Sequence, residues 1–460
     1  MKLNLTLCTL AAAAVLMMAG SCQTKTRLEP VPEPTWFDYE DYYIEKSDLF
    51  AQLPIYPENI VMLGDEIIDF GEWTDFFQDT SFVNRGIMFE GSPHTLYRVD
   101  GIAQAKPKKI FVSTGLQDIK RAKDEDASAA ADEVIANVKE IFRRAHALSP
   151  ETRLFFLSIV ADRQVSDAGV AAIEKANKAI SEDAAKSKYY EIIDISGLAD
   201  ESGRMAEQYT YDGRSLNGAG YEIVTDQLLH KGFSSFKEKY NKAADREYKE
   251  ISPAHHNRVS LFNSLPENTH SVIFLGNSIT RRGPWEELLP IVRTSNRGVG
   301  GDTVKGIYNR LDDVAAAAPA AIFLMAGIND LTNPACDVDQ LWKEYSKLIE
   351  AIKKEIPNTP FYVQSTLPVT AERDSDNTIN PKVHELNKYL QAAEKKFSYI
   401  YLDVAKALSD ENGCLKAEYS IDGLHLNADA YFVWSTVLIN EGSLVMLARH
   451  QRTMDEESNK

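Results

Sequence analysis

Short apolar runs alternate with segments of helical periodicity in the second half of the chain. The apolar runs predict strands at Val272–Leu275, Ala321–Met325, Phe361–Gln364 and Ile400–Leu402, and a further short strand before Asn296. Runs that are apolar throughout are typical of strands buried on both faces of a parallel sheet.

Two segments between these strands show one apolar face at helical spacing. The first face consists of Val304, Ile307, Leu311 and Val314, and the second of Val338, Leu341, Trp342, Tyr345, Leu348, Ile349 and Ile352. Strands that alternate with helices predict βαβ units, and therefore an α/β/α sandwich of three layers with a parallel sheet. Ligands bind such open sheets beyond the carboxyl ends of the strands, so residues that directly follow a strand are candidates for chemistry.

The chain repeats itself at a nearly constant spacing. Leu49–Pro54 matches Leu261–Pro266, a spacing of 261 − 49 = 212 residues. The same spacing pairs Val61–Gly64 with Ile273–Gly276, Trp73 with Trp285, Asn84–Gly86 with Asn296–Gly298, and Gly115 with Gly327. Near the ends, Tyr211–Gly213 corresponds to Ile421–Gly423 at a spacing of 210. A period maintained over this length predicts two tandem copies of one sandwich domain.

The repeat divides the chain into six expected parts. They are a signal peptide (1–22), a tether (23–47), a first domain (48–240), a linker (241–259), a second domain (260–450) and a polar tail (451–460). The linker is predicted from its charge and from Pro253.

Composition narrows the classes of function. At 460 residues with 44% hydrophobic content, the chain can bury two domain cores. A formal net charge of −18 argues against a nucleic-acid binder, because such proteins usually carry a basic patch. The sequence contains no CxxC pair, no HExxH and no Cys/His cluster at ligand spacing, so we expect no metal site.

The N-terminus has the pattern of an export signal. Lys2 precedes a mostly apolar run, Leu3–Ala19, and small residues lead up to Cys22. The stretch Ala19–Cys22 resembles the lipobox of bacterial lipoproteins, which implies that Cys22 is acylated and anchors the exported protein to a membrane through this lipid only. An ordinary signal peptide or a short anchor is the alternative, and it also places the protein outside the cytoplasm. The membrane face stays open.

Two cysteines remain for the folded part. Cys8 would leave with the signal and Cys22 would carry the lipid, so Cys336 and Cys414 are left. Whether they pair cannot be read from the sequence.

Four blocks of polar residues lie where the predicted strands end or the last helix begins. They are Gly276–Thr280, Asn296–Thr303, Ala326–Asp330 and Asp422–His425. In this order the blocks resemble the SGNH (GDSL-like) hydrolase family over nearly the whole second copy. The resemblance implies a flavodoxin-like sandwich and ester hydrolysis without a cofactor.

The resemblance assigns roles residue by residue. Ser278 is similar to the family's nucleophile, Asp422 and His425 to its acid and base, and Gly301 and Asn329 to its oxyanion donors.

Elementary chemistry agrees with these roles. A serine hydroxyl needs a base that accepts its proton near neutral pH, and an imidazole steadied by a carboxylate supplies one. The Ser278 and Gly301 backbone N–H groups and the Asn329 amide would stabilise the oxyanion. The sequence departs from the family at Asn277, where the family expects aspartate; Asn277, Arg297 and Asp330 are the candidates for substrate contact.

The first copy lacks most of these residues. At the same spacing, Glu66 replaces the nucleophile, Phe89 the glycine and Gln117 the asparagine, and at the later spacing Ser215 replaces the histidine, while Asp212 remains. We therefore expect an inactive copy that serves either as a scaffold or as a sugar- or partner-binding module.

The branch of the family with the most similar second block contains acetylhydrolases and carbohydrate O-acetylesterases. It implies removal of O-acetyl groups from a small-molecule or glycan ester, such as an acetylated sialic acid. A lipid or aryl acylhydrolase and a non-catalytic glycan-binding lipoprotein are the alternatives. The oligomeric state stays open.

Overall fold

The computed structural model describes residues 28–34, 40–229 and 252–458. The predicted signal peptide with Cys22, residues 23–27 and 35–39 of the tether, and the boundary between the first domain and the linker lie outside these residues. Both sheets belong to one compact unit, Pro32–Lys460.

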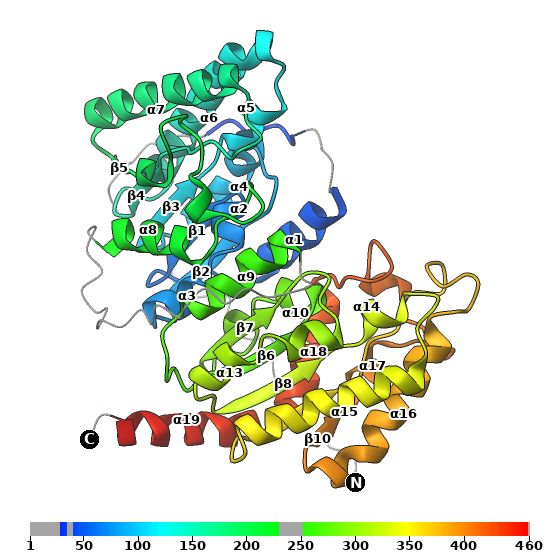
Figure 1. The fold of residues 1–460 in the computed structure, drawn as a ribbon. Coiled ribbons are helices and arrows are strands. Elements are labelled where there is room, and N and C mark those ends of the chain that lie inside the picture. The colour runs from blue at the N-terminus through cyan, green and yellow to red at the C-terminus, as the bar shows by residue number, and fades with distance from the viewer. Residues whose placement is uncertain (1–27, 35–39, 230–251, 459–460) are drawn as a thin grey trace, which may run out of the picture. The chain divides into compact units, whose positions relative to one another are not determined.

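The first sheet has five parallel strands, β1 (Ile60–Gly64), β2 (Phe82–Gly86), β3 (Lys109–Ser113), β4 (Arg153–Leu157) and β5 (Tyr190–Ile193) (Figure 1). Their spatial order is β2-β1-β3-β4-β5. The chain therefore reverses its direction of growth between β1 and β3, and ligands of open sheets bind at such a point, beyond the carboxyl ends of the strands.

The second sheet repeats this arrangement with β6 (Val272–Gly276), β7 (Thr294–Gly298), β8 (Ala321–Met325), β9 (Phe361–Gln364) and β10 (Ile400–Leu402). Its order, β7-β6-β8-β9-β10, is the order of the first sheet, and all pairs are parallel. The expected α/β sandwich class is confirmed. The strand expected before Asn296 instead includes it and continues to Gly298, because Asn296 and Arg297 pair in register with β6.

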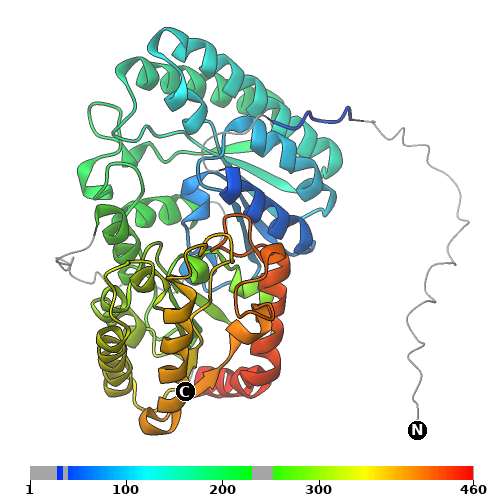
Figure 2. The same ribbon diagram turned by 90° about the vertical axis from the view of Figure 1, so that its right-hand side faces the viewer.

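Helices flank each sheet in both views (Figures 1 and 2). In the first half they are α1 (Glu40–Gln52), α2 (Glu66–Asp69), α3 (Trp73–Phe77), α4 (Ser92–Gln104), α5 (Leu116–Arg121), α6 (Ala127–Leu148), α7 (Asp167–Ser187) and α8 (Gly218–Leu229), with 3-10 turns at Asp124–Asp126, Ser196–Leu198 and Glu207–Tyr209. In the second half they are α9 (Pro253–Asn263), α10 (Ser278–Arg282), α11 (Trp285–Leu288), α12 (Val304–Tyr308), α13 (Asp312–Ala316), α14 (Ile328–Leu331), α15 (Val338–Glu355), α16 (Asn380–Phe397), α17 (Val404–Leu408), α18 (Ala428–Glu441) and α19 (Leu444–Ser458), with a 3-10 turn at Ala417–Tyr419.

Each strand buries side chains on both faces of its sheet. In β1, Val61 and Leu63 join the core formed with α4, α6 and α7, whereas Ile60 and Met62 join the core formed with α2, α3 and α8. Side chains alternate between the faces of a strand, so a strand covered on both sides by apolar helix faces is largely apolar at successive positions. This is why β1 and β6 read as continuous apolar runs.

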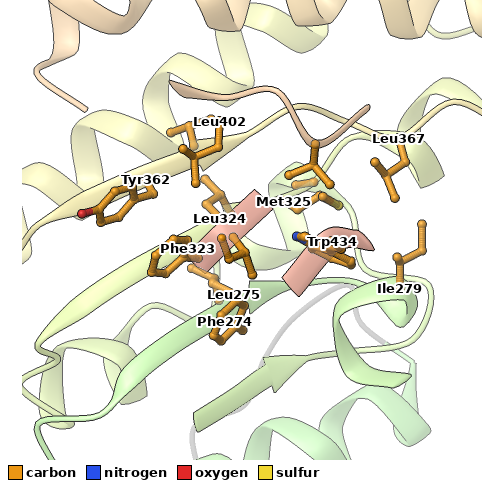
Figure 3. Packing of buried hydrophobic residues seen from close by; sticks show 14 of the residues in the cluster. Phe274, Leu275, Ile279, Phe323, Leu324, Met325, Tyr362, Leu367, Leu402 and Trp434 are labelled. Carbon is orange, nitrogen blue, oxygen red and sulfur yellow. The ribbon is translucent and has the colours of Figure 1, made fainter. Parts of the chain in front are cut away.

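Aromatic rings fill one face of the second sheet. Phe274, Phe323 and Tyr362 come from neighbouring strands and stack in a row, with ring centroids 5.2 and 4.4 Å apart (Figure 3). Trp285 stacks on Phe274 at 4.1 Å and meets Trp434 of α18 edge to face at 4.7 Å. The rings fix α11 and α18 against β6, the strand that precedes Ser278.

The two halves exchange their first helices. Leu49 and Leu53, at the end of α1, belong to the core of the second half, and α1 packs against α18. Leu261 and Leu265, at the end of α9, belong to the core of the first half, and α9 packs against α8. These leucines are the pairs that the 212-residue spacing relates, so each half completes the other's core in the same way.

Two buried arginines join the halves. Arg85 of β2 donates to both oxygens of Glu287 at 2.7 Å, and Arg297 of β7 donates to Asp75 at 2.8 Å and to Asp313 at 2.9 Å. The side chains of both arginines are 1% exposed. The pairs Arg85–Glu287 and Arg297–Asp75 are related by the same spacing of 212 residues, so the junction has approximate two-fold symmetry.

Three of the predicted boundaries fall within helices. The expected tether contains the first turns of α1, and the expected linker contains the first turns of α9, where Pro253 follows the N-cap Ser252 instead of marking a loop. The expected polar tail continues α19, which buries Gln451 so that its amide bonds His270 and Arg293.

The helix expected around Val304–Val314 is interrupted. It forms α12 and α13, and between them Arg310 is buried with its guanidinium on the carbonyls of Gly276 and Arg297. Val304 and Val314 still point into the core, so the periodicity identified the buried face but not the break.

Two further observations concern the described part of the chain. Cys336 and Cys414 are free thiols. Within the described ranges, no single helix is long and apolar enough to cross a membrane; α18 and Leu444–Glu456 meet that test only as a pair bent by 72°.

Removal of one buried charge at the junction between the halves is predicted to lower the stability of the protein strongly. Asp75→Ala is expected to lower the free energy of unfolding by about 3 kcal/mol, because buried Arg297 loses a partner. Urea denaturation measures this. Glu191→Ala, which removes the exposed pair with Arg153 (side chains 49% and 51% exposed), is the control and is expected to cost less than about 1 kcal/mol. Equal effects of the two changes would contradict a structural role for the buried pair.

Candidate functional site

Ser278 is the first residue of α10, directly beyond the carboxyl end of β6. Asn277 caps this helix, because its side-chain oxygen accepts the Ile279 N–H at 3.0 Å. The turn before it requires glycine: a Cβ on Gly276 would lie 2.2 Å from Thr280 Oγ1. The strand, the tight turn and the cap together set the direction of the serine side chain.

The structure brings Ser278, His425 and Asp422 together, although 147 residues separate the serine from the histidine. His425 Nε2 lies 2.9 Å from Ser278 Oγ, and His425 Nδ1 lies 2.6 Å from Asp422 Oδ2. The other oxygen of Asp422 accepts the backbone N–H groups of Leu424 and His425 at 2.8 and 2.7 Å. The carboxylate is therefore held at both oxygens and fixes the imidazole next to the hydroxyl.

The electrostatics keep this pair ready for proton transfer. Burial acts to raise the pKa of Asp422, but hydrogen bonds from His425 and from backbone N–H groups outweigh it and hold the pKa well below its usual value. Burial lowers the pKa of His425, the bond to Asp422 opposes this, and nearby Arg282 lowers the pKa further. The imidazole is therefore neutral near pH 7 and can accept a proton.

The expected oxyanion donors lie at the same end of the sheet. Asn329 belongs to α14, which follows β8, the strand next to β6, and its side-chain N–H donates to the Asp302 carbonyl at 2.8 Å. That bond fixes the amide and leaves it one further N–H. Gly301 is exposed with φ +74°, in the left-handed region that glycine adopts without strain.

The three candidates for substrate contact have different surroundings. Asn277 is 1% exposed and caps α10, and Arg297 is buried between Asp75 and Asp313. Neither side chain is available to a ligand, because each is enclosed and engaged within the fold, and this corrects the expectation for both.

Asp330 is half-buried, and one of its oxygens accepts the Val304 N–H at 3.2 Å. Burial raises the pKa of this carboxyl to about 6. Its contact with substrate stays a prediction.

Sequence reasoning missed Glu45. This α1 residue is 3% exposed and accepts a 2.5 Å bond from Arg282, at the end of the helix that begins with Ser278. Burial raises the pKa of Glu45 to about 7. No spacing in the sequence relates residues 45 and 282, since only the exchange of α1 brings them together.

The corresponding residues of the first half form a closed arrangement. One oxygen of Glu66 accepts a bond from the side-chain amide of Gln117, and the other accepts the Phe89 N–H at 3.4 Å. Gln117 and Phe89 stand at the positions of Asn329 and Gly301. The Glu66 carboxylate thus occupies donors at the positions that correspond to Asn329 and Gly301.

The backbone at Phe89 preserves the shape of that position. Its φ is +65°, close to the +74° of Gly301, although a bulky side chain disfavours this region. The same loop conformation therefore exists in both halves with different side-chain chemistry.

Residues 274–432 match the model of the GDSL-like Lipase/Acylhydrolase family. This GDSL-like segment contains Ser278, Gly301, Asn329, Asp422 and His425. Its similarity to acylhydrolases agrees with the arrangement of a hydroxyl, an imidazole and a carboxylate.

Individual proteins resemble parts of the chain. An N-acylneuraminate cytidylyltransferase of Escherichia coli is 28% identical over 190 residues, which are 40% of this chain and 42% of that protein. The chain thus spans less than half the length of that relative. Platelet-activating factor acetylhydrolase IB subunit alpha2 of Rattus norvegicus is 24% identical over 183 residues, 38% of this chain and 76% of that protein. An acetyl xylan esterase of known crystal structure is 21% identical to this chain. The matched region is 37% of this chain and 98% of the esterase chain, with a TM-score of 0.32.

Metal ligands are not grouped in the described ranges. No cluster of three or more His, Cys, Asp or Glu side chains that could hold an ion occurs there.

The position of Arg282 predicts the direction of a pKa change. Arg282→Gln is expected to raise the pKa of His425, because a positive charge that disfavours the imidazolium is removed. An NMR titration of the histidine ring carbons measures the His425 pKa, and the signal that is missing in His425→Gln identifies this residue. Arg449→Gln removes an exposed charge on α19 and is expected to leave the His425 titration unchanged. A lower or unaltered His425 pKa in Arg282→Gln would contradict the prediction.

Proposed function

We propose that the second half hydrolyses carboxylic esters through Ser278, His425 and Asp422. The observation that carries this proposal is the continuous chain of hydrogen bonds from Ser278 Oγ through His425 to Asp422, at 2.9 and 2.6 Å. A base within hydrogen-bond reach of a nucleophile, itself oriented by a third group, is the geometry of covalent acyl transfer.

The reaction follows from this geometry in two steps. His425 Nε2 accepts the proton of Ser278 as Oγ attacks the acyl carbonyl, and Asp422 stabilises the imidazolium. His425 then gives the proton to the leaving alcohol, which leaves an acyl-serine. Water, deprotonated by His425, attacks that ester; the bond from the acyl carbon to Ser278 Oγ breaks, His425 returns the proton to Oγ, and the acid is released. The Ser278 and Gly301 N–H groups and the free N–H of Asn329 receive the oxyanion in both steps.

The proposed substrate is an O-acetyl ester on a carbohydrate, with an acetylated sialic acid as the first choice. One relative is named as an acetylhydrolase, and another is named after N-acylneuraminate, a sialic acid. These similarities support an acetyl group and an acidic sugar respectively.

The first half is proposed to be a second, non-catalytic copy of the same domain. Its sheet has the same strand order, and its Glu66 carboxylate occupies the amide and backbone donors that hydrolysis would need. The N-terminal sequence supports export as a lipoprotein anchored through Cys22.

The catalytic assignment predicts a specific loss. Ser278→Ala is expected to lower the kcat for p-nitrophenyl acetate by roughly 10⁴-fold or more, because among the described residues no other hydroxyl is paired with His425. Glu66→Gln, which changes the corresponding residue of the first half, is expected to retain activity. Full activity in Ser278→Ala would overturn the assignment, and inert wild-type protein would favour the alternative of a glycan-binding protein.

The acyl preference separates acetylesterase from lipid acylhydrolase. The proposal predicts that kcat/KM is higher for the acetyl than for the octanoyl p-nitrophenyl ester, and that O-acetylated sialic acid is deacetylated with loss of activity in Ser278→Ala. Faster hydrolysis of the octanoyl ester would favour a lipid or aryl acylhydrolase, which needs a wider apolar acyl pocket.

A further inference from the structure

The first half contains a cavity at the place that corresponds to the catalytic site of the second half. Its volume is about 210 Å³, and Glu66, Phe89, Asp212 and Ser215 line it. These four positions correspond to Ser278, Gly301, Asp422 and His425. Because Ser215 is much smaller than the imidazole at the corresponding position, space opens between Glu66 and Asp212.

Two carboxylates in the cavity are already held by the fold. Glu66 is bonded to Gln117 and to the Phe89 N–H. Asp212 uses one oxygen, Oδ1, to accept from the Thr210 hydroxyl at 3.1 Å and from two backbone N–H groups at 2.8 Å. In the described residues no bond to Asp212 Oδ2 is recorded, so this oxygen can accept from a hydroxyl of a ligand.

The second half contributes two donors to the same cavity. Asn257 of α9 is 2% exposed; its oxygen accepts the Tyr211 N–H at 2.7 Å, but its buried Nδ2 has no acceptor among the described residues. A buried amide nitrogen without a partner is costly, and a ligand oxygen would satisfy it.

Arg281 of α10 is the second donor. Its guanidinium stacks 4.1 Å from the ring centroid of Phe70, and both residues line the cavity. No carboxylate of the described chain lies within salt-bridge distance of it, whereas the neighbouring Arg258 is paired with Glu72. Burial and the charge of Arg258 lower the pKa of Arg281, which an anion in the cavity would reverse.

We propose that this cavity binds a small acidic sugar, with its carboxylate on Arg281 and the Asn257 amide and a hydroxyl on Asp212. A carboxylate matches the fork of a guanidinium, and hydroxyls match a carboxylate acceptor. Phe70 and Phe89 provide apolar walls for a sugar ring. The volume is below the roughly 300 Å³ at which drug-sized pockets begin, so it suits a monosaccharide and not a longer glycan. The proposal goes beyond ester hydrolysis and does not depend on it.

The test is calorimetric titration of the full soluble chain, carrying Ser278→Ala, with N-acetylneuraminate and glucuronate. Glucose and N-acetylglucosamine are the neutral controls. The proposal predicts that at least one acidic probe binds and that the neutral sugars bind at least tenfold more weakly. Absence of binding by both acids, or equal binding of acidic and neutral sugars, would overturn it.

Two variants locate the binding. Ser215→Leu fills the cavity and is expected to abolish binding, with an unchanged thermal unfolding midpoint as evidence that the chain folds. Arg281→Gln is expected to weaken binding of the acid at least tenfold, whereas the matched Arg282→Gln, whose side chain pairs with Glu45 instead, retains it. Binding that survives both Ser215→Leu and Arg281→Gln lies elsewhere and rejects the cavity as the site.

Discussion

The buried guanidinium groups of Arg85 and Arg297 each lie between a strand of one half and a carboxylate of the other. A buried charge is tolerated only when it is paired and hydrogen-bonded, so the two sheets are held in an arrangement in which both pairs form at once. The exchange of α1 and α9 adds an apolar constraint, since each helix completes the core of the opposite half. Each half therefore has a core cluster that contains leucines of the other half.

Helix α10 connects the junction between the halves with the candidate catalytic site. It begins with Ser278, and its last turn presents Arg281 to the cavity of the first half and Arg282 to Glu45 of α1. The candidate catalytic site therefore contains a charge partner from the beginning of the folded chain, and the cavity of the first half contains donors from α9 and α10. Each site is built from both halves.

The same backbone carries two different sets of side chains. Gly301 and Phe89 have nearly the same positive φ, and both follow a second strand with the same register. In one half the Asn329 amide beside this loop donates to the Asp302 carbonyl and keeps a further N–H; in the other, the Glu66 carboxylate accepts from the corresponding Gln117 amide and from the Phe89 N–H. Function here depends on the side chains at strand ends and not on the fold, which both halves share.

The sequence alone determined the sheet class and most strands of the second half, because strands buried on both faces are largely apolar. It also named Ser278, Asp422 and His425, which the structure brings together. It did not reveal that α1 and α9 are exchanged, that Arg297 is enclosed by Asp75 and Asp313, or that Glu45 meets Arg282. Local patterns record which face of an element is buried, but not which partner buries it. That choice depends on long-range packing and on the pairing of buried charges, which only the tertiary structure decides.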